Sequence, residues 1–344
     1  MMSIQKPKMK KFLIMRIGAI GDVIMTTPII KAIKKKYPSS HVTYIVGRWS
    51  SEVLKHNPDI DLLWIVNEEM FFNKDTKKLA NLIKELRKED FDYGIILDKS
   101  WFFNLFLFLC RVKNRYGFSR EHHLINKILL SKQVRFLGKK KEYEYYSDIL
   151  YTSLGLKYRY SDMALYPTKK EKSVINKYME SFNGKFIGIA PGGAINPGQK
   201  ALQKRWPKKY YSKLVNHLLL EKNKVFILGG DGDKHYNRFS EFEDHKNYYN
   251  LTGAFNIRQM YYLLKKYCCA FISHDSGPIH LAAAAKVRKI IALFGPTPPE
   301  RFAPENSIIL KSKIPSSYTI LGEFKSNKGG METIKVEEVL EHLK

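Results

Sequence analysis

Short apolar runs alternate with amphipathic, helix-like segments along the whole chain. Segments such as Leu79–Lys88, which lie between the runs, repeat their apolar residues with helical spacing. The strand-like runs are Phe12–Arg16, Val42–Val46, Leu62–Val66, Tyr93–Leu97, Phe186–Ala190, Lys224–Leu228, Cys269–Ser273 and Lys289–Phe294. Strands that alternate with helices favour βαβ units, so the sequence predicts an α/β fold with parallel sheets.

The length of the chain and one polar stretch predict two domains. A chain of 344 residues is longer than most single domains. The sequence turns polar between Tyr158 and Lys177, where Pro167 precedes a charged run. We predict an N-terminal domain over residues 1–166 and a C-terminal domain over residues 167–330. Residues 331–344 are predicted to hold a terminal helix that packs back on the N-terminal domain.

The composition excludes several classes of protein. With 44% hydrophobic and 27% charged residues the chain is neither collagen-like nor wholly disordered. Its most apolar segment, Trp101–Cys110, is interrupted by Asn104 and is much shorter than the roughly 20 residues of a membrane-spanning helix. We expect a buried helix there, with lipid contact as the alternative. No cleavable apolar leader is apparent, and the three cysteines have neither disulfide nor metal-ligand spacing, which predicts a cytoplasmic protein.

The net charge predicts an attraction to polyanions. The chain has 59 Lys and Arg against 33 Asp and Glu, a formal charge of +26. Phosphates, nucleic acid and anionic lipid are the partners that such a charge favours. Short basic clusters occur at residues 34–36, 139–141 and 169–172. We interpret most of this charge as solvated surface, with contact between one cluster and an anionic partner as the alternative.

Glycine-rich polar loops follow four of the predicted strands. These loops are Ile17–Asp22, Pro191–Gly193, Gly229–Asp233 and His274–Pro278. Ligands of parallel α/β sheets bind beyond the carboxyl ends of the strands. The four loops therefore predict a ligand-binding cleft.

The first loop does not have the G-x-G-x-x-G spacing of dinucleotide sites, so a nicotinamide cofactor is not indicated. Gly18 and Gly21 allow a tight turn from strand to helix. Asp22 then stands at the start of the helix. Two roles are open for it: an N-cap that accepts backbone N–H groups, or a carboxylate base that the helix N-terminus keeps ionised.

The loop at His274 has the sequence of a helix start. Ser276 can cap the helix, and Pro278 suits its first turn. The amides of Ser276 and Gly277, together with the helix dipole, form a candidate phosphate site, with His280 one turn further on. A well-capped helix without a ligand is the alternative.

Two other stretches carry candidate groups. Lys204 can reach over whatever Gly192 and Gly193 hold, while the nearby Trp206 is interpreted as a packing anchor rather than a stacking platform for a base. The carboxylates of Asp231 and Asp233 allow two interpretations: a divalent-metal pair that bridges a diphosphate, or a single carboxylate on ribose hydroxyls.

Three ordered motifs together resemble glycosyltransferase family nine, the lipopolysaccharide heptosyltransferases. They are Met15–Val23 with Thr27 and Pro28, then Lys204–Pro207, then Asp275–Ala283. The resemblance implies a GT-B fold, in which two Rossmann-like domains with parallel sheets face a central cleft. The N-terminal domain would receive the acceptor and the C-terminal domain would hold a nucleotide sugar.

The resemblance also implies roles for individual residues. Asp22 would be the catalytic base, Gly18 and Gly21 would lie on the acceptor side, and Asp233 would contact the nucleoside. The donor diphosphate and sugar would be bound by Gly192, Gly193, Lys204, Asp275, Ser276, Gly277 and His280. Such enzymes invert the anomeric centre without a metal or other cofactor, so the interpretation of Asp231 and Asp233 as metal ligands loses support.

In the family the donor is typically ADP-heptose and the acceptor is the lipid A inner core, an acidic glycan. The resemblance therefore implies a peripheral protein at the anionic inner face of the cytoplasmic membrane. The motifs do not select the sugar or the acceptor position. The alternatives are a transferase of the same fold that uses another nucleotide sugar for a different surface glycan, and a non-catalytic polyanion-binding protein. Basic motifs interleaved with aromatic residues are absent, so we expect no nucleic-acid partner.

Overall fold

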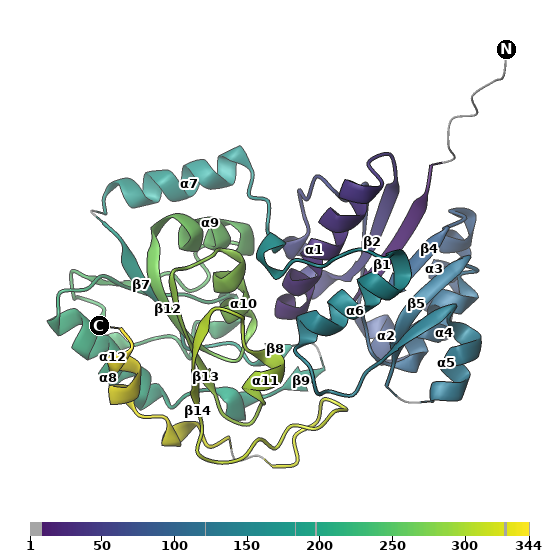
Figure 1. Ribbon diagram of the computed structural model, residues 1–344. Helices are drawn as coiled ribbons and strands as arrows, with labels where there is room; N and C mark the ends of the chain where they lie inside the picture. Colours follow the sequence, from purple (N-terminus) through teal and green to yellow (C-terminus); the bar gives the residue numbers. More distant parts are fainter. Residues whose placement is uncertain (1–8, 121, 183, 197, 327–328, 344) are drawn as a thin grey trace. The chain divides into compact units, whose positions relative to one another are not determined.

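The computed structural model describes residues 9–120, 122–182, 184–196, 198–326 and 329–343 (Figure 1). The chain forms two compact units. The first contains the residues up to Gly18 together with Met25–Leu137 and Tyr143–Met163; the second contains Ala19–Ile24, Gly138–Glu142 and Ala164–Lys344. The main change of unit, between Met163 and Ala164, falls close to the boundary predicted after Tyr166. Residues 19–24 and 138–142 depart from that prediction because they group with the second unit.

The first unit is built on a six-stranded sheet in which every pairing is parallel, with the order β3-β2-β1-β4-β5-β6. Its strands are β1 (Lys11–Arg16), β2 (His41–Gly47), β3 (Leu62–Val66), β4 (Tyr93–Ile96), β5 (Asn114–Ser119) and β6 (Lys132–Arg135). Its helices are α1 (Ile20–Lys36), α2 (Glu69–Phe72), α3 (Thr76–Lys88), α4 (Trp101–Leu109), α5 (His123–Leu129) and α6 (Glu142–Leu154), with short 3₁₀ turns at Arg48–Val53 and Tyr160–Asp162.

The second unit repeats this topology, with a parallel sheet of order β11-β10-β7-β12-β13-β14. Its sheet strands are β7 (Phe186–Ala190), β10 (Val225–Ile227), β11 (Tyr248–Asn250), β12 (Cys268–His274), β13 (Lys289–Phe294) and β14 (Ser307–Lys311), and β8 (Ile195–Asn196) and β9 (Gln199–Lys200) form a small hairpin. Its helices are α7 (Lys169–Glu180), α8 (Lys208–Leu220), α9 (Ile257–Tyr267), α10 (Gly277–Ala284), α11 (Pro299–Phe302) and α12 (Val336–Glu341). Turns of 3₁₀ helix occupy Leu202–Lys204, Asp231–Asp233, Ser240–Phe242 and Met331–Thr333.

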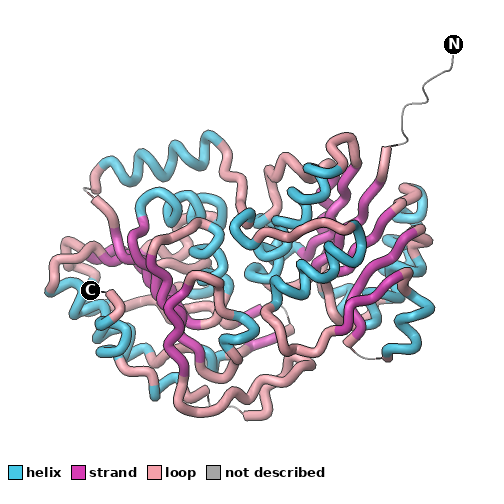
Figure 2. The backbone as a smooth tube through the Cα atoms, viewed as in Figure 1, coloured by secondary structure: helices cyan, strands magenta, loops and turns pink. Residues whose placement is uncertain are grey.

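Both sheets have the Rossmann strand order, in which the sequence of strands reverses beside the first strand of each unit. Figure 2 shows the second sheet between two helix layers, α9 and α10 on one face and α8 with α12 on the other. The predicted α/β class with parallel sheets is confirmed. All eight predicted strands exist, while β5, β6, β11 and β14 were not predicted.

The end of the chain packs differently from the prediction. Val336 and Val339 of α12 are buried in the core of the second unit, beside α8. The indole Nε1 of Trp206 donates to the backbone oxygen of Ile334 at 3.0 Å, just before this helix. The expectation that residues 331–344 pack on the N-terminal domain is therefore wrong. The predicted role of Trp206 as a packing anchor is confirmed, because its side chain is fully buried.

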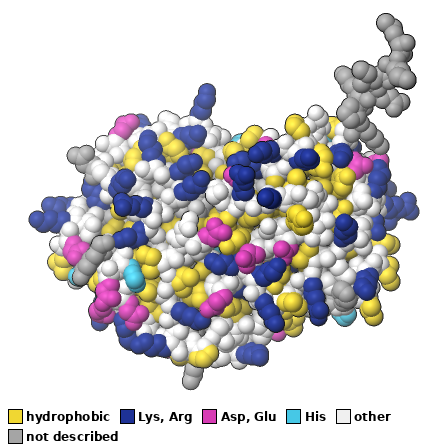
Figure 3. All heavy atoms as spheres, viewed as in Figure 1, with side chains coloured by type: hydrophobic (Ala, Val, Ile, Leu, Met, Phe, Trp, Pro, Cys, Tyr) yellow, Lys and Arg dark blue, Asp and Glu magenta, His cyan; other side chains and the backbone are white. Residues whose placement is uncertain are grey.

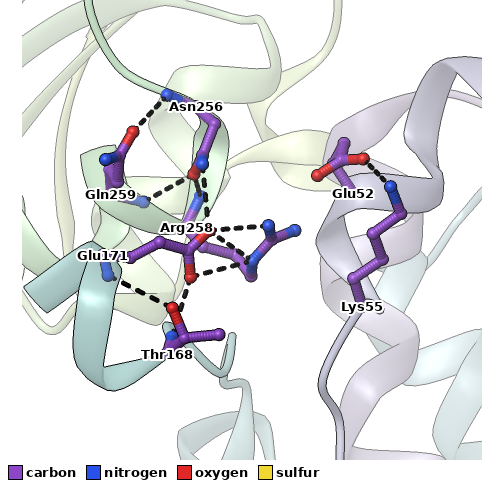
Figure 4. Close-up of polar contacts among 7 residues, drawn as sticks. All are labelled: Glu52, Lys55, Thr168, Glu171, Asn256, Arg258 and Gln259. Carbon is purple, nitrogen blue, oxygen red and sulfur yellow. Dashed lines mark hydrogen bonds and ion pairs between the residues drawn. The ribbon is translucent and has the colours of Figure 1, made fainter.

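A buried ion pair joins α7 to α9 in the second unit (Figure 4). Thr168 and Glu171 form a capping box at the start of α7, and Asn256 forms one with Gln259 at the start of α9. Glu171 also accepts from the Arg258 guanidinium at 2.7 Å and from the Asn256 amide at 2.9 Å. Burial would raise the pKa of the Glu171 carboxyl, but these donors outweigh it and hold the pKa at about 2. The same figure shows the separate ion pair between Glu52 and Lys55 in the first unit.

Candidate functional site

Three of the four loops predicted to bind a ligand meet beside β7 in the second unit. This strand pairs with β10 on one side and β12 on the other, so the loops after all three strands lie at one edge of the sheet. A Cβ atom placed on Gly193 would lie 3.2 Å from the Cβ of Ser276. The glycine loop after β7 and the N-terminus of α10 are thus neighbours at the reversal of strand order, the place where Rossmann sheets bind ligands; we call this place the crevice.

An ion pair between Lys204 and Asp275 lies in this crevice. The Lys204 Nζ is 2.8 Å from the Asp275 Oδ2, and that oxygen also accepts from the Thr297 hydroxyl at 2.8 Å. The Asp275 side chain is only 7% exposed, which by itself raises the pKa of its carboxyl. The nearby Lys204 charge and the two hydrogen bonds outweigh burial and lower the pKa, so Asp275 is ionised at neutral pH.

Aromatic rings surround the Lys204 ammonium group. It lies 5.8 to 5.9 Å from the ring centroids of Phe302, Tyr318 and Phe324. Tyr318 and Phe324 belong to the loop-rich stretch before Gly330, to which the sequence assigned no role. These rings restrict the position of the cation without neutralising it.

Helix α10 begins at this ion pair, as the sequence predicted, but its cap differs. Ser276 is the N-cap residue, yet its side chain makes no capping hydrogen bond; its Oγ donates to the His274 backbone oxygen at 3.2 Å. The prediction that the Ser276 side chain caps the helix is therefore wrong. Gly277 and Pro278 form the first turn as expected. Because α10 starts between Asp275 and His280, the positive end of its dipole faces the crevice.

Two buried histidines flank this helix start. Burial lowers the pKa of His274 to about 3 and also lowers the pKa of His280. The His280 Nδ1 has no hydrogen-bond partner among the described residues, although it is buried. Both imidazoles are neutral at pH 7, so His280 can exchange hydrogen bonds with a ligand without adding a charge.

Asp22 is inside the first turn of α1, two residues after the helix begins at Ile20. The interpretation of Asp22 as an N-cap is therefore wrong, because the helix starts earlier than the sequence suggested. Residues 19–24 belong to the second unit, where a Cβ on Gly21 would lie 2.6 Å from the His280 ring. The Asp22 charge raises the pKa of His280 against the dominant effect of burial. This charge coupling relates Asp22 to His280 and, through it, to Asp275.

The carboxylate of Asp233 binds backbone amides. Its Oδ1 accepts from the Gly193 N–H at 2.6 Å and its Oδ2 from the Gly230 N–H at 3.0 Å. Gly192 lies so close that a Cβ there would be 2.5 Å from Oδ1. Asp231 is 80% exposed and pairs with Lys234, so the two acidic side chains of this loop engage different partners.

Two residues of the crevice were not predicted. Arg205 donates through Nε and Nη2 to the Gly193 backbone oxygen, at 3.0 and 2.8 Å, and its guanidinium lies 4.4 Å from the Tyr236 ring centroid. Thr297, which binds Asp275, follows β13 in the stretch Gly295–Pro296–Thr297. The strand-end rule that selected the other loops would also have found Thr297.

The first unit has an ion pair of its own at the carboxyl ends of its strands β1 and β4. Arg16 ends β1 and forms a buried ion pair with Asp98, just beyond β4. Asp98 also accepts from the Ile17 N–H at 2.9 Å. A Cβ on Gly18 would lie 2.9 Å from the Arg16 guanidinium, so a larger residue there would displace this group. Gly18, predicted to lie on the acceptor side, is therefore in a turn that the contacts of Arg16 and Asp98 hold in place.

No described helix has the length and hydropathy that a bilayer span needs. Among the described residues, no three or more His, Cys, Asp or Glu side chains are grouped so that they could hold a metal ion.

Comparison with known proteins relates this geometry to one family. A sequence model described as "Glycosyltransferase family 9 (heptosyltransferase)" matches residues 79–318. "Lipopolysaccharide heptosyltransferase 2" of Escherichia coli strain K12 is 25% identical over 331 residues, covering 93% of this chain and 91% of that protein.

Two solved structures have the same architecture. A glycosyl transferase family 9 structure from Veillonella parvula is 22% identical, with a TM-score of 0.81, and covers 98% of this chain and 97% of that one. The structure of the E. coli ADP-heptose lps heptosyltransferase II is 21% identical, with a TM-score of 0.72 and 97% of each chain covered. The predicted GT-B fold is confirmed.

Proposed function

Because the chain belongs to glycosyltransferase family 9 and is a glycosyltransferase, we propose that it transfers a heptose from ADP-heptose to a hydroxyl group of the lipid A inner core of lipopolysaccharide. The observation that carries the proposal is the Lys204–Asp275–Thr297 cluster at the start of α10. A nucleoside diphosphate is the ligand that a lysine beside a helix N-terminus favours. Its relatives include a lipopolysaccharide heptosyltransferase and an ADP-heptose heptosyltransferase, which supports the choice of donor and acceptor.

The proposed reaction is a direct displacement at the anomeric carbon. Asp22 accepts the proton of the acceptor hydroxyl, whose oxygen forms the new glycosidic bond while the bond to the diphosphate breaks. Lys204 and the backbone N–H groups of Ser276 and Gly277 stabilise the negative charge that develops on the departing ADP. Neutral His280 hydrogen-bonds the donor between base and leaving group. Gly192 and Gly193 let the diphosphate approach the backbone.

The reaction proceeds without a metal ion in this proposal. The cation that offsets the diphosphate charge is Lys204, which Asp275 and the surrounding aromatic rings hold in place. Gly21 and Gly18 lie on the acceptor side, and Asp233 orients the loop that meets the nucleoside. The enzyme works at the cytoplasmic face of the inner membrane, where its acceptor is made.

A donor panel tests the substrate. The full chain, incubated with a heptose-deficient core acceptor and with ADP-, UDP-, GDP- or CMP-linked sugars, is expected to give a product heavier by one heptose with ADP-heptose only. Mass spectrometry of the acceptor measures it. Transfer of a different sugar, with none from ADP-heptose, would replace this function by the same-fold alternative.

The base is tested separately. Asp22→Asn is expected to lower kcat by roughly 100-fold, the usual scale for a general base, and to leave the Kd for ADP unchanged. Asp231→Asn is the matched control, because Asp231 loses the same charge at an 80% exposed position. Normal turnover in Asp22→Asn would remove Asp22 from the reaction.

A further inference from the structure

One surface of the first unit combines exposed apolar side chains with a strong excess of basic residues. Helix α5 exposes Leu124 (74%), Ile125 (44%) and Ile128 (72%), and the end of α4 exposes Phe108 (39%) and Leu109 (38%). We call these five residues the α5 surface. Large aliphatic side chains that gather on one short helix leave a patch of a kind that monomeric proteins seldom expose unless it binds something.

The two helices are held together firmly. The buried Asn104 of α4 donates to the buried Asn126 of α5 at 2.9 Å. Arg115 binds the Leu129 backbone oxygen at 2.7 Å, and its guanidinium lies 5.2 Å from the Phe108 ring centroid. The polar contacts of α5 therefore face inward. Because Leu124 and Ile128 are four residues apart, they project from the same side of the helix.

Basic residues dominate the stretch of chain that forms this surface, and one of them, Lys113, pairs with Asp90 and Asp92. Residues 101–137 include seven basic side chains and a single acidic one, Glu121. The basic residues are Arg111, Lys113, Arg115, Arg120, Lys127, Lys132 and Arg135. Figure 3 shows hydrophobic and basic side chains side by side at the edge of the unit where Figure 1 places α5.

A second apolar edge of the same unit shows that this pairing is not a general property of the chain. Leu62 and Ile65 of the edge strand β3 are 38% and 41% exposed. The surrounding residues 49–75 contain six acidic side chains against two lysines, Lys55 and Lys74. That edge would be repelled by an anionic surface, so these two apolar edges of the first unit differ in the charge beside them.

We propose that the α5 surface docks the protein on an anionic lipid bilayer. Leu124, Ile125 and Ile128 enter the boundary between headgroups and acyl chains, while Lys127 and Lys132 bind lipid phosphates. Charge complementarity selects this occupant over a second copy of the chain, because two copies would bring two basic rims together. The inference deepens the proposed function, since the bilayer holds the acceptor, but binding to vesicles can be measured without any transfer reaction.

The experiment is flotation of the full chain with vesicles of phosphatidylcholine that contain 30% phosphatidylglycerol, against pure phosphatidylcholine. The wild type is expected to float with the anionic vesicles only. Leu124→Glu/Ile128→Glu is expected to lower its partition constant at least tenfold. Leu220→Glu is the matched control, because Leu220 is 73% exposed in the second unit, and it should float almost as the wild type does.

The electrostatic part has its own pair of variants. Lys127→Gln/Lys132→Gln should lower the partition constant by about fivefold for each lysine, and Lys222→Gln/Lys246→Gln, at exposed positions of the second unit, should lower it far less. Equal effects of the two pairs would mean that charge acts without a defined surface.

Three outcomes would overturn the proposal. The first is a wild type that stays with the soluble fraction at every lipid composition. The second is an unchanged partition constant in Leu124→Glu/Ile128→Glu. The third is a wild-type dimer that light scattering shows to be dissociated by this variant, which would make a second copy the occupant. Transfer to a delipidated acceptor should stay normal in the variant, so a failure of the donor assignment is distinguishable from a failure of docking.

Discussion

Replacing Lys204 by Met removes the cation that faces a buried carboxylate. In the wild type the Lys204 Nζ lies 2.8 Å from the Asp275 Oδ2, and the two side chains are 18% and 7% exposed. Met retains most of the apolar stem of lysine, so the change isolates the charge. Of the two donors to Asp275, Lys204 and Thr297, only the Thr297 hydroxyl then remains. A buried carboxylate that loses its cation destabilises the folded state.

We expect Lys204→Met to lower the free energy of unfolding by about 3 kcal/mol, the lower end for breaking a buried ion pair, because Lys204 is partly exposed. For a unit of this size that corresponds to a decrease of roughly 6–12 °C in the Tm of the second unit, measured by scanning calorimetry. Lys213→Met, an exposed change on α8, is the control and should leave the Tm unchanged.

The effect depends on pH with a definite sign. Lys204 and Thr297 hold the pKa of Asp275 below its unfolded value, so their stabilisation is present above about pH 4 and is lost as the pH falls through the lower folded pKa. In Lys204→Met, burial instead raises the pKa of Asp275, and protonation relieves the cost. The difference in Tm between wild type and variant should therefore be largest at pH 7 and shrink below pH 4.

A double variant separates stability from function. Lys204→Met/Asp275→Asn contains no buried charge at this place, so it should regain most of the lost Tm. Its turnover should stay low, since the cation that faces the diphosphate is still missing. Recovery of both quantities would refute the reasoning, because Lys204 would then act only as the partner of Asp275. A Tm unchanged by Lys204→Met would refute the energetic argument.

Three other perturbations test the remaining parts. Glu171→Gln should destabilise the second unit by about 2 kcal/mol at pH 7, since Glu171 accepts from Arg258 and Asn256. In urea unfolding, the wild type should lose stability as the pH falls from about 4.5 to about 2, because the Glu171 carboxyl is protonated over this range. The variant should not show this loss. Gly192→Ala places a Cβ 2.5 Å from the Asp233 Oδ1 and so displaces this loop; KM for the nucleotide sugar should rise about tenfold, and an unaltered KM would exclude the loop from the donor site. EDTA should leave the turnover of the purified enzyme intact, whereas a loss that manganese restores would give Asp231 and Asp233 the metal role.

The central strands could be predicted from the sequence because both faces of a parallel sheet are buried. Phe186–Ala190 and Lys289–Phe294 match β7 and β13 to the residue. Leu62–Val66 matches β3 equally well, although β3 is an edge strand, because its apolar run is continuous. Strands β5 and β11, with the sequences NRYGFS and YYN, have no continuous apolar run. Their strand conformation comes from pairing with a neighbour, a tertiary effect that local sequence does not encode.

The sequence predicted candidate site residues in the loops that follow strands, but it misplaced the start of a helix. Lys204 and Asp275 were both predicted to lie at the donor diphosphate, but their ion pair and the hydroxyl of Thr297 required the fold. Asp22 is not the N-cap residue of α1, because the helix begins at Ile20 and Asp22 lies within its first turn. Helix ends are uncertain by one or two residues from sequence, and that margin separates a cap from a first-turn carboxylate.

The position of Asp233 near the glycine loop does not by itself tell which groups its carboxylate binds. Its carboxylate accepts from the amides of Gly193 and Gly230, while Arg205 binds the Gly193 carbonyl oxygen from the other side. Gly193 has φ +90°, a conformation that glycine tolerates best, and the side chains of Asp233 and Arg205 hold the peptide units before and after it. A ligand that meets the loop encounters groups that are already oriented, and little ordering entropy remains to be lost on binding. Asp233 therefore positions the backbone of this loop, and so does Arg205, which lies inside the motif Lys204–Pro207 but was given no role of its own.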